Sequence, residues 1–129
     1  MMIWADKAKQ FLGAICSKDI TIMEGLFADD IKFCSWGCNV QGKDAALKVN
    51  RDHIKLVKET KIKIHNTAYK DKYICIECNL SHSYKFNIVD AFDTANVKLA
   101  NSTISISLVY IIEFNDVGKI KSIKSYKLK

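Results

Sequence analysis

Residues 27–42, which read FADDIKFCSWGCNVQG, decide how the rest of the chain is organised. A helical pattern runs into this stretch and is expected to end at 29–30. The alternation over 31–36 then predicts a short strand, and its mainly apolar face should point into the core. That inward face carries Ile31, Phe33 and Ser35. A loop with Gly37 and Gly42 leads on to another helix. The stretch therefore predicts the first wall of a pocket that helices cover.

Two predicted helices precede this strand and one follows it. Residues 3–16 have helical period, with an apolar face of Ile3, Trp4, Ala8, Phe11, Leu12 and Ile15. Gly13 costs stability in a helix, which suggests that something packs closely against it. Asp19 is a suitable cap for a second helix that runs through Phe27. Lys43 and Asp44 open the third helix, in which Ala46, Leu47, Val49, Asn50, Ile54 and Val57 recur at steps of three and four residues.

From residue 61 the hydrophobic period changes to two, which predicts strands at 61–69, 73–84, 103–114 and 119–127. Turns are expected at 71–72 and 115–118. The inward positions are Ile62, Ile64 and Ala68, then Ile74, Ile76, Cys78, Leu80 and His82, then Ile104, Ile106, Leu108, Tyr110, Ile112 and Phe114. Residues 86–99 suggest a loop or hairpin tip, with a short helical turn at 89–92 as an option. The order predicts one α+β domain, residues 1–129, with helices on one side of a curved antiparallel sheet.

Composition argues against two kinds of partner. The formal net charge is +6, but Arg51 is the only arginine and the lysines are scattered without a dense stripe. Nucleic-acid recognition favours arginine and clustered charge, so no nucleic-acid partner is expected. No apolar run approaches the roughly 18 residues of a membrane span, so no membrane partner is expected. Five cysteines cannot close a disulfide framework, and a cytoplasmic location with reduced thiols is the simplest interpretation.

The spacing of the cysteines could be interpreted as a zinc site, but the strand geometry argues against it. Cys75 and Cys78 are three residues apart in one predicted strand, so their side chains point to opposite faces. With Cys34 and Cys38 they cannot form a four-thiolate site without a bulge. We expect no metal and no cofactor. Cys16 and Cys78 are better interpreted as buried thiols, whereas Cys34 and Cys38 could oxidise if they are exposed.

Two motifs resemble those of a known superfamily. One is LFADDI at 26–31, followed by Gly37 and by GKDAA at 42–46; the other is IEFNDVGKIKSI at 112–123. Together they resemble the nuclear transport factor 2-like superfamily, which includes ketosteroid isomerases and SnoaL-like polyketide cyclases. The resemblance implies a cone-shaped sheet, a cystatin-like α+β barrel, with about three helices from the N-terminal half packed on its concave side. It also implies a deep apolar pocket and a homodimer through the sheet.

The isomerase chemistry does not carry over to this chain. Ketosteroid isomerases use a catalytic base, a phenol and a protonated carboxylic acid. By this resemblance, the matching positions in this chain are Ser35, Phe11 and Tyr110, in that order. A serine hydroxyl lacks the basicity to take a proton from carbon unaided, and phenylalanine has no donor. Of the three, only Tyr110 could donate a hydrogen bond, so we predict no steroid isomerase activity, and the catalytic residues stay unassigned.

Nine side chains are predicted to line the pocket: Phe11, Ile15, Phe33, Ser35, Ile54, His82, Leu108, Tyr110 and Ile112. Ser35 and Tyr110 could form a polar pair for a ligand, or the tyrosine could simply bond to Ser35 or a buried water. His82 could be an acid or base at the pocket rim, or could end its strand in solvent. The run 51–53 on the third helix is interpreted as a solvated face, and Trp36 as packing under a helix or at an interface.

Two functions from different classes follow. The first is a domain that binds a hydrophobic small molecule, with an isomerase, cyclase or hydrolase activity as an option. The second is a non-catalytic dimerisation or partner-binding module of the same fold. It would use the outer sheet face, where Ser81, Ser83, Ser105 and Ser107 surround Val109 and Ile111. Bulky side chains that fill the cone would favour the second.

Overall fold

A computed structural model describes residues 2–35, 37–85, 88–89, 97–98 and 102–128. The helices are α1 (Met2–Ser17), α2 (Ile20–Leu26) and α3 (Lys43–Leu56). The strands are β1 (Phe27–Ser35), β2 (Cys38–Gln41), β3 (Val57–Lys70), β4 (Tyr73–Tyr84), β5 (Ile88–Val89), β6 (Val97–Lys98), β7 (Thr103–Phe114) and β8 (Ile120–Lys127). The packing predicted for Trp36 and the turn predicted at 89–92 fall wholly or partly outside the described residues. The paired β5 and β6 agree with the predicted hairpin.

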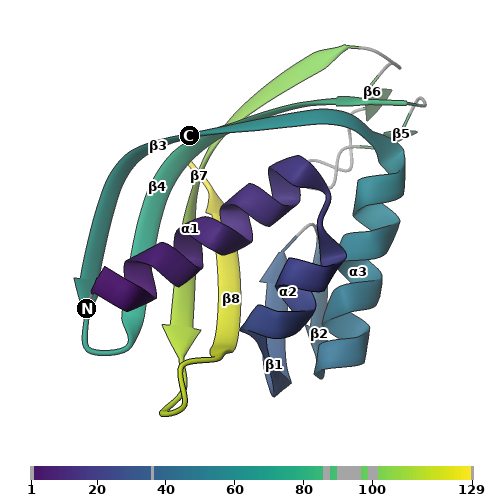
Figure 1. Cartoon of the computed structure of the whole chain (residues 1–129). Coiled ribbons are helices and arrows are strands. Elements are labelled where there is room, and N and C mark those ends of the chain that lie inside the picture. The colour runs from purple at the N-terminus through teal and green to yellow at the C-terminus, as the bar shows by residue number, and fades with distance from the viewer. Residues whose placement is uncertain (1, 36, 86–87, 90–96, 99–101, 129) are drawn as a thin grey trace.

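The sheet is curved, and its strands run in the order β2-β1-β8-β7-β4-β3 (Figure 1). This confirms the predicted α+β fold class. Two details differ from the expectation. β1 pairs with β8 in parallel, so the sheet is mixed. β8 is the last strand of the chain, and it lies between β1 and β7 in the sheet. The sheet also stays open between its edge strands β2 and β3 rather than closing into a barrel.

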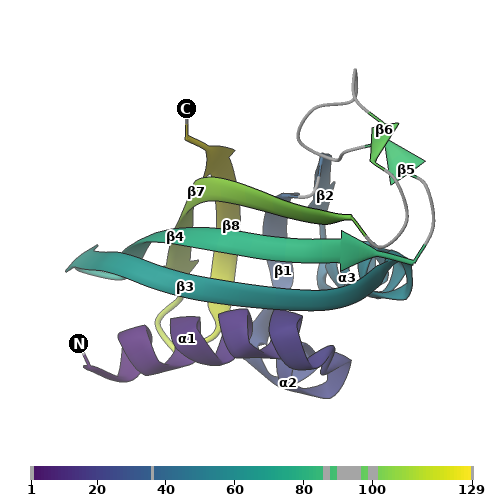
Figure 2. The ribbon, with the colours of Figure 1, turned by 90° about the horizontal axis from the view of Figure 1, so that it is seen from above.

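The helices cover the concave side of the sheet (Figures 1 and 2). α1 packs on β3 and β4 through a face that includes the fully buried Ala8 and Phe11, whereas Ile3, predicted for that face, is 56% exposed. α3 packs on β1, β2 and β3. Gly13 was expected to have a close neighbour, but a Cβ added there meets nothing within 4 Å, since the residue lies on the exposed side of α1.

The boundary between α2 and β1 corrects one prediction. Asp19 caps α2 as expected, since its side chain accepts a hydrogen bond of 3.1 Å from the Ile22 amide. The helix ends at Leu26, not at 29–30, because Phe27 is already extended, with φ −79° and ψ 137°. Apolar residues continue across this junction and mimic a longer helix. Beyond Gly37, the expected loop contains the short strand β2, which pairs with β1.

Strand β3 begins four residues earlier than predicted, at Val57, and it contains a bulge. The register with β4 shifts between Ile64 and Asn66. An extra residue reverses which side chains face inward, so Ala68 is exposed although it was predicted to face the same way as Ile62. By contrast β4 and β7 have the predicted bounds.

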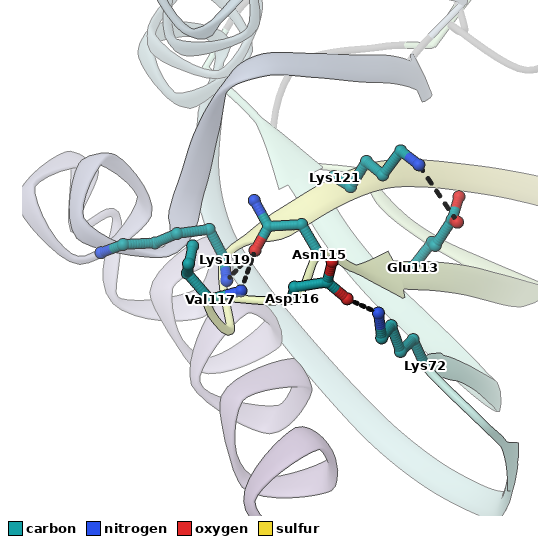
Figure 3. Close-up of polar contacts among 7 residues, drawn as sticks. All are labelled: Lys72, Glu113, Asn115, Asp116, Val117, Lys119 and Lys121. Carbon is teal, nitrogen blue, oxygen red and sulfur yellow. Dashed lines mark hydrogen bonds and ion pairs between the residues drawn. The ribbon is translucent and has the colours of Figure 1, made fainter.

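The β7–β8 turn is tied to α1. Within the turn, the Asn115 side chain accepts hydrogen bonds from the amides of Val117, at 3.1 Å, and Lys119, at 2.9 Å (Figure 3). Gly118 has φ +84°, as the predicted turn requires, and its carbonyl accepts a bond of 2.8 Å from the Lys7 ammonium. The Trp4 ring stacks on Phe114, with centroids 5.0 Å apart. These contacts anchor the start of α1 to the end of the sheet where β7 and β8 are joined.

Candidate functional site

The interior of the cone brings together most of the predicted pocket residues. Phe11, Phe33, Leu108, Tyr110 and Ile112 have no exposed surface, and Ile15 is 3% exposed. Phe11 from α1 meets the Tyr110 ring edge-on, with centroids 6.1 Å apart, and Phe33 contacts Phe27, at 6.4 Å. Side chains without exposed surface leave no water-sized space beside them. These residues therefore pack as a core, and Ile54 lies half-buried at its margin.

Tyr110 places a phenol at the centre of this core. Its hydroxyl is buried and has no hydrogen-bond partner in the part of the chain that the structure describes. Burial raises the pKa of Tyr110 well above its ordinary value, and the nearby thiols of Cys78 and Cys16 raise it further. The phenol therefore keeps its proton at neutral pH. A buried hydroxyl without a partner costs about 1–3 kcal/mol, so this is the site's clearest unmet bonding capacity.

Ser35 does not form the predicted pair with Tyr110. It is buried at the end of β1, and its Oγ lies 2.6 Å from Oγ of Ser125 on β8. Ser125 is the cross-strand neighbour of Tyr110, so all three side chains lie on the concave face. The two serine hydroxyls nevertheless form a hydrogen bond with each other and not with the Tyr110 hydroxyl.

A second polar group lies where α3 and β4 end. His82 faces inward as predicted and is 2% exposed, so it neither ends its strand in solvent nor lies at an open rim. Its Nε2 lies 2.8 Å from the Tyr84 hydroxyl. The ring centroid of His53, on α3, is 5.6 Å from that of His82 and 6.4 Å from that of Tyr84. We call these three residues the histidine cluster.

His53 corrects the interpretation of 51–53 as a solvated face, since it is only 9% exposed. The signal was present in the sequence. Ala46, Asn50 and His53 follow one another at steps of four and three, which is one helix face. Burial, and then the proximity of His82, lowers the pKa of His53 to about 3, so its imidazole is neutral at neutral pH. Tyr84, at the end of its strand, was not recognised as a site residue.

The cysteines behave largely as the strand geometry predicts. Cys78 is buried and Cys75, three residues away, is exposed, so they cannot share a metal. Cys16 is only half-buried, Cys34 is half-buried and Cys38 is exposed. Over the described ranges, no group of three or more histidine, cysteine, aspartate and glutamate side chains is placed to hold a metal ion.

Shallow hollows lie outside the cone, near the turn in Figure 3. Three of them, of about 290 to 400 Å³, share Asp30 in their walls. Their charges are mixed: Lys72 pairs with Asp116, and Lys121 lies 3.7 Å from Glu113. Exposed pairs of this kind contribute little and present no net charge to a ligand. These hollows are a weaker candidate than the core and the histidine cluster.

The architecture and the apolar interior define a class: a helix-covered, curved-sheet cone. Its solved relatives are similar in fold but distant in sequence. An LEH-like epoxide hydrolase from M. tuberculosis matches at a TM-score of 0.76 and 15% identity, over 99% of this chain and 84% of that one. A candidate SnoaL-like polyketide cyclase from Shewanella denitrificans matches at 0.79 and 12%, over 99% and 92%. A ketosteroid isomerase-like protein from Catenulispora acidiphila, in complex with trimethylamine, matches at 0.74 and 11%, over 93% and 83%.

The chain therefore has the nuclear transport factor 2-like fold, as its motifs indicated. No protein-family profile matches the sequence, and no curated protein matches it. At these identities the similarity shows the fold alone, and activity has to be argued from the site. In the described part of the chain, none of the helices is both long and apolar enough to cross a membrane.

Proposed function

We propose that this domain binds a neutral hydrophobic small molecule inside the cone, with the Tyr110 hydroxyl as its hydrogen-bond donor. The observation that carries the proposal is the buried phenol without a partner among the described residues. A ligand oxygen would satisfy it and recover most of the cost of its burial. Relatives of the same fold are named as an epoxide hydrolase and as candidate polyketide cyclases, which supports an interior that admits small molecules.

The interior also defines the ligand's chemistry. A phenol whose pKa is raised acts as a donor, so the complementary ligand group is an acceptor such as a carbonyl or epoxide oxygen. The fully or largely buried polar side chains of the described residues include no lysine, arginine, aspartate or glutamate, so a charged ligand has no counter-ion there. Phe11 packs on Tyr110, and both are fully buried, so a ligand can reach the hydroxyl only if α1 moves away from the sheet.

A pair of probes tests the hydrogen bond. Acetophenone and ethylbenzene have similar shapes, but only acetophenone has a carbonyl acceptor. Calorimetry of the unmodified chain is expected to show acetophenone binding about 3- to 10-fold more tightly, the worth of one net hydrogen bond. Tyr110→Phe is expected to remove that preference while leaving the ligand-free protein as stable or more stable, since an unsatisfied hydroxyl is lost.

The control is Tyr69→Phe, because Tyr69 is 46% exposed on β3. It should change neither the preference nor the stability. Equal affinity of the two probes for the unmodified chain would contradict the proposal. So would a clear loss of ligand-free stability in Tyr110→Phe, which would mean that the hydroxyl already has a partner.

A second candidate function is self-association through the outer sheet face, which the filled core favours. Val109 and Ile111 face outward yet are half-buried, and Val109 pairs with Tyr126, which is 51% exposed. Ile111→Asp should then weaken a dimer at least 100-fold in sedimentation equilibrium, because it buries a charge in an apolar contact. Ile22→Asp is the control, since Ile22 is 40% exposed on α2, away from that face. A monomer at all accessible concentrations would reject this function.

A further inference from the structure

The histidine cluster lies where three elements meet. α3 ends at Leu56, β3 starts at Val57, and β4 ends at Tyr84, which pairs with Val57. The Lys85 amide donates to the Leu56 carbonyl at 2.8 Å. The Lys18 ammonium, between α1 and α2, donates to the Val57 carbonyl at 2.6 Å. A change inside the cluster therefore acts on the contact between the last turn of α3 and the end of β4.

The burial and close packing of the cluster favour uncharged imidazole rings. His53, His82 and Tyr84 are 9%, 2% and 1% exposed, and their rings contact one another. Two imidazolium ions 5.6 Å apart would repel each other in an environment that screens charge poorly. Even one buried imidazolium would lose its hydration. The closed arrangement thus favours the uncharged state of both histidines.

The charges around the cluster favour the same state. On α3, β3 and β4 and the segment after β4, the nearest charged residues along the chain are the exposed Arg51, Lys55, Lys58 and Lys85, together with Asp52 and Glu59; the half-exposed Lys18 joins them from between α1 and α2. Asp52 is bonded to Lys48 at 2.8 Å, and Glu59 lies 3.7 Å from Lys61. Lysines outnumber carboxylates, and both carboxylates have cationic partners. Neither carboxylate is therefore free to stabilise a positive charge on the rings.

We infer that the histidine cluster is an acid-sensitive latch, which holds the last turn of α3 on the end of β4 and releases it when His53 gains a proton. The inference goes beyond the proposed function and does not depend on ligand binding. It describes a local opening of the cone at one end, with the rest of the sheet intact. The chemical signal is the proton, and the group that responds is a buried imidazole.

The direction of the effect follows from the pKa of His53. Burial lowers it from 6.5 to about 3 in the closed state, and an opened, hydrated His53 returns toward 6.5. The opened state therefore binds more protons between these values, and closing is fully favoured only above pH 6.5. Opening becomes easier as the pH falls from there toward 3. At pH 5 the equilibrium constant for opening should be about 25-fold larger than at pH 7.

Hydrogen exchange with mass spectrometry tests the latch. After correction for the intrinsic pH dependence, amides in 50–58 and 80–85 are expected to exchange about 25-fold faster at pH 5 than at pH 7. Amides in 106–114, within the core of β7, should not change. His53→Phe keeps a ring at the position but removes the titrating group, and less than a threefold change should remain. His65→Phe is the matched control, because His65 is exposed on β3.

Two results of the exchange experiment would overturn the inference, and one result of a titration would do so as well. The first is a uniform acceleration that includes 106–114, because that would be global acid unfolding. The second is no acceleration in 50–58 and 80–85. An imidazole NMR titration of the unmodified chain covers the case in which His53→Phe does not fold. Titration of His53 above pH 6, without a change in exchange, would equally reject the latch.

Discussion

Phe11→Ala is expected to lower the free energy of unfolding by about 3–5 kcal/mol, the usual cost of removing a buried phenyl ring. Phe11 has no exposed surface and lies between Tyr110 and Phe27, whose ring centroids are 6.1 and 5.9 Å away. It thereby joins α1 to β7 and to the start of β1. Its loss removes apolar burial and leaves a cavity that the rigid strands cannot close. Urea unfolding followed by tryptophan fluorescence measures the change.

The same variant tests whether the cone is filled. Tyr69→Ala, at a 46% exposed aromatic on β3, should cost less than about 1 kcal/mol and serves as the control. If Phe11→Ala costs no more than this control, Phe11 does not pack as the structure indicates, and the interior is hollow or mobile there. If it costs the expected amount, benzene should bind the new cavity and restore part of the stability. That cavity adjoins the Tyr110 ring and so provides an open form of the proposed site.

Much of the fold followed from periodicity and turn chemistry. β4 and β7 alternate strictly and have the predicted bounds, and the 115–118 turn has its glycine where a positive φ is needed. What failed were features that depend on distant pairing. The parallel contact of β1 with β8 joins segments about 90 residues apart, and the bulge in β3 has no local signature. β2 was missed for another reason: it pairs with the adjacent β1 but is only four residues long, too short for alternation to reveal it.

The site was harder to predict than the fold for a related reason. Parity placed Ser35, His82 and Tyr110 on the inward face, and the structure agrees. The alternation of side chains along a strand does not determine which inward groups form hydrogen bonds with each other. Ser35 bonds to Ser125, because β8 and not β7 lies beside β1. His53 joined the cluster only when α3 was docked against the end of β4, a contact between elements that local sequence does not specify.

The second large effect is expected at Gly118. Gly118→Ala should destabilise the fold by about 2–3 kcal/mol. Its φ of +84° costs a residue with a side chain roughly 1–2 kcal/mol. The added Cβ would also lie 2.8 Å from the Lys7 ammonium and 3.3 Å from the Trp4 ring. The ammonium can swing aside, but the ring is held against Phe114, so the start of α1 has to shift.

Two other glycines and one double variant separate these causes. Gly13 and Gly25 lie in helices, and a Cβ at either meets nothing within 4 Å, so alanine there should leave stability unchanged or raise it by up to about 1 kcal/mol. Lys7→Ala removes the flexible neighbour, and in that background Gly118→Ala should cost less if the ammonium contact matters. A cost unchanged by Lys7→Ala assigns the loss to backbone strain and the Trp4 ring. If Gly118→Ala instead behaves like Gly13→Ala, the turn does not hold the start of α1, and the anchoring of that helix lies elsewhere along its buried face.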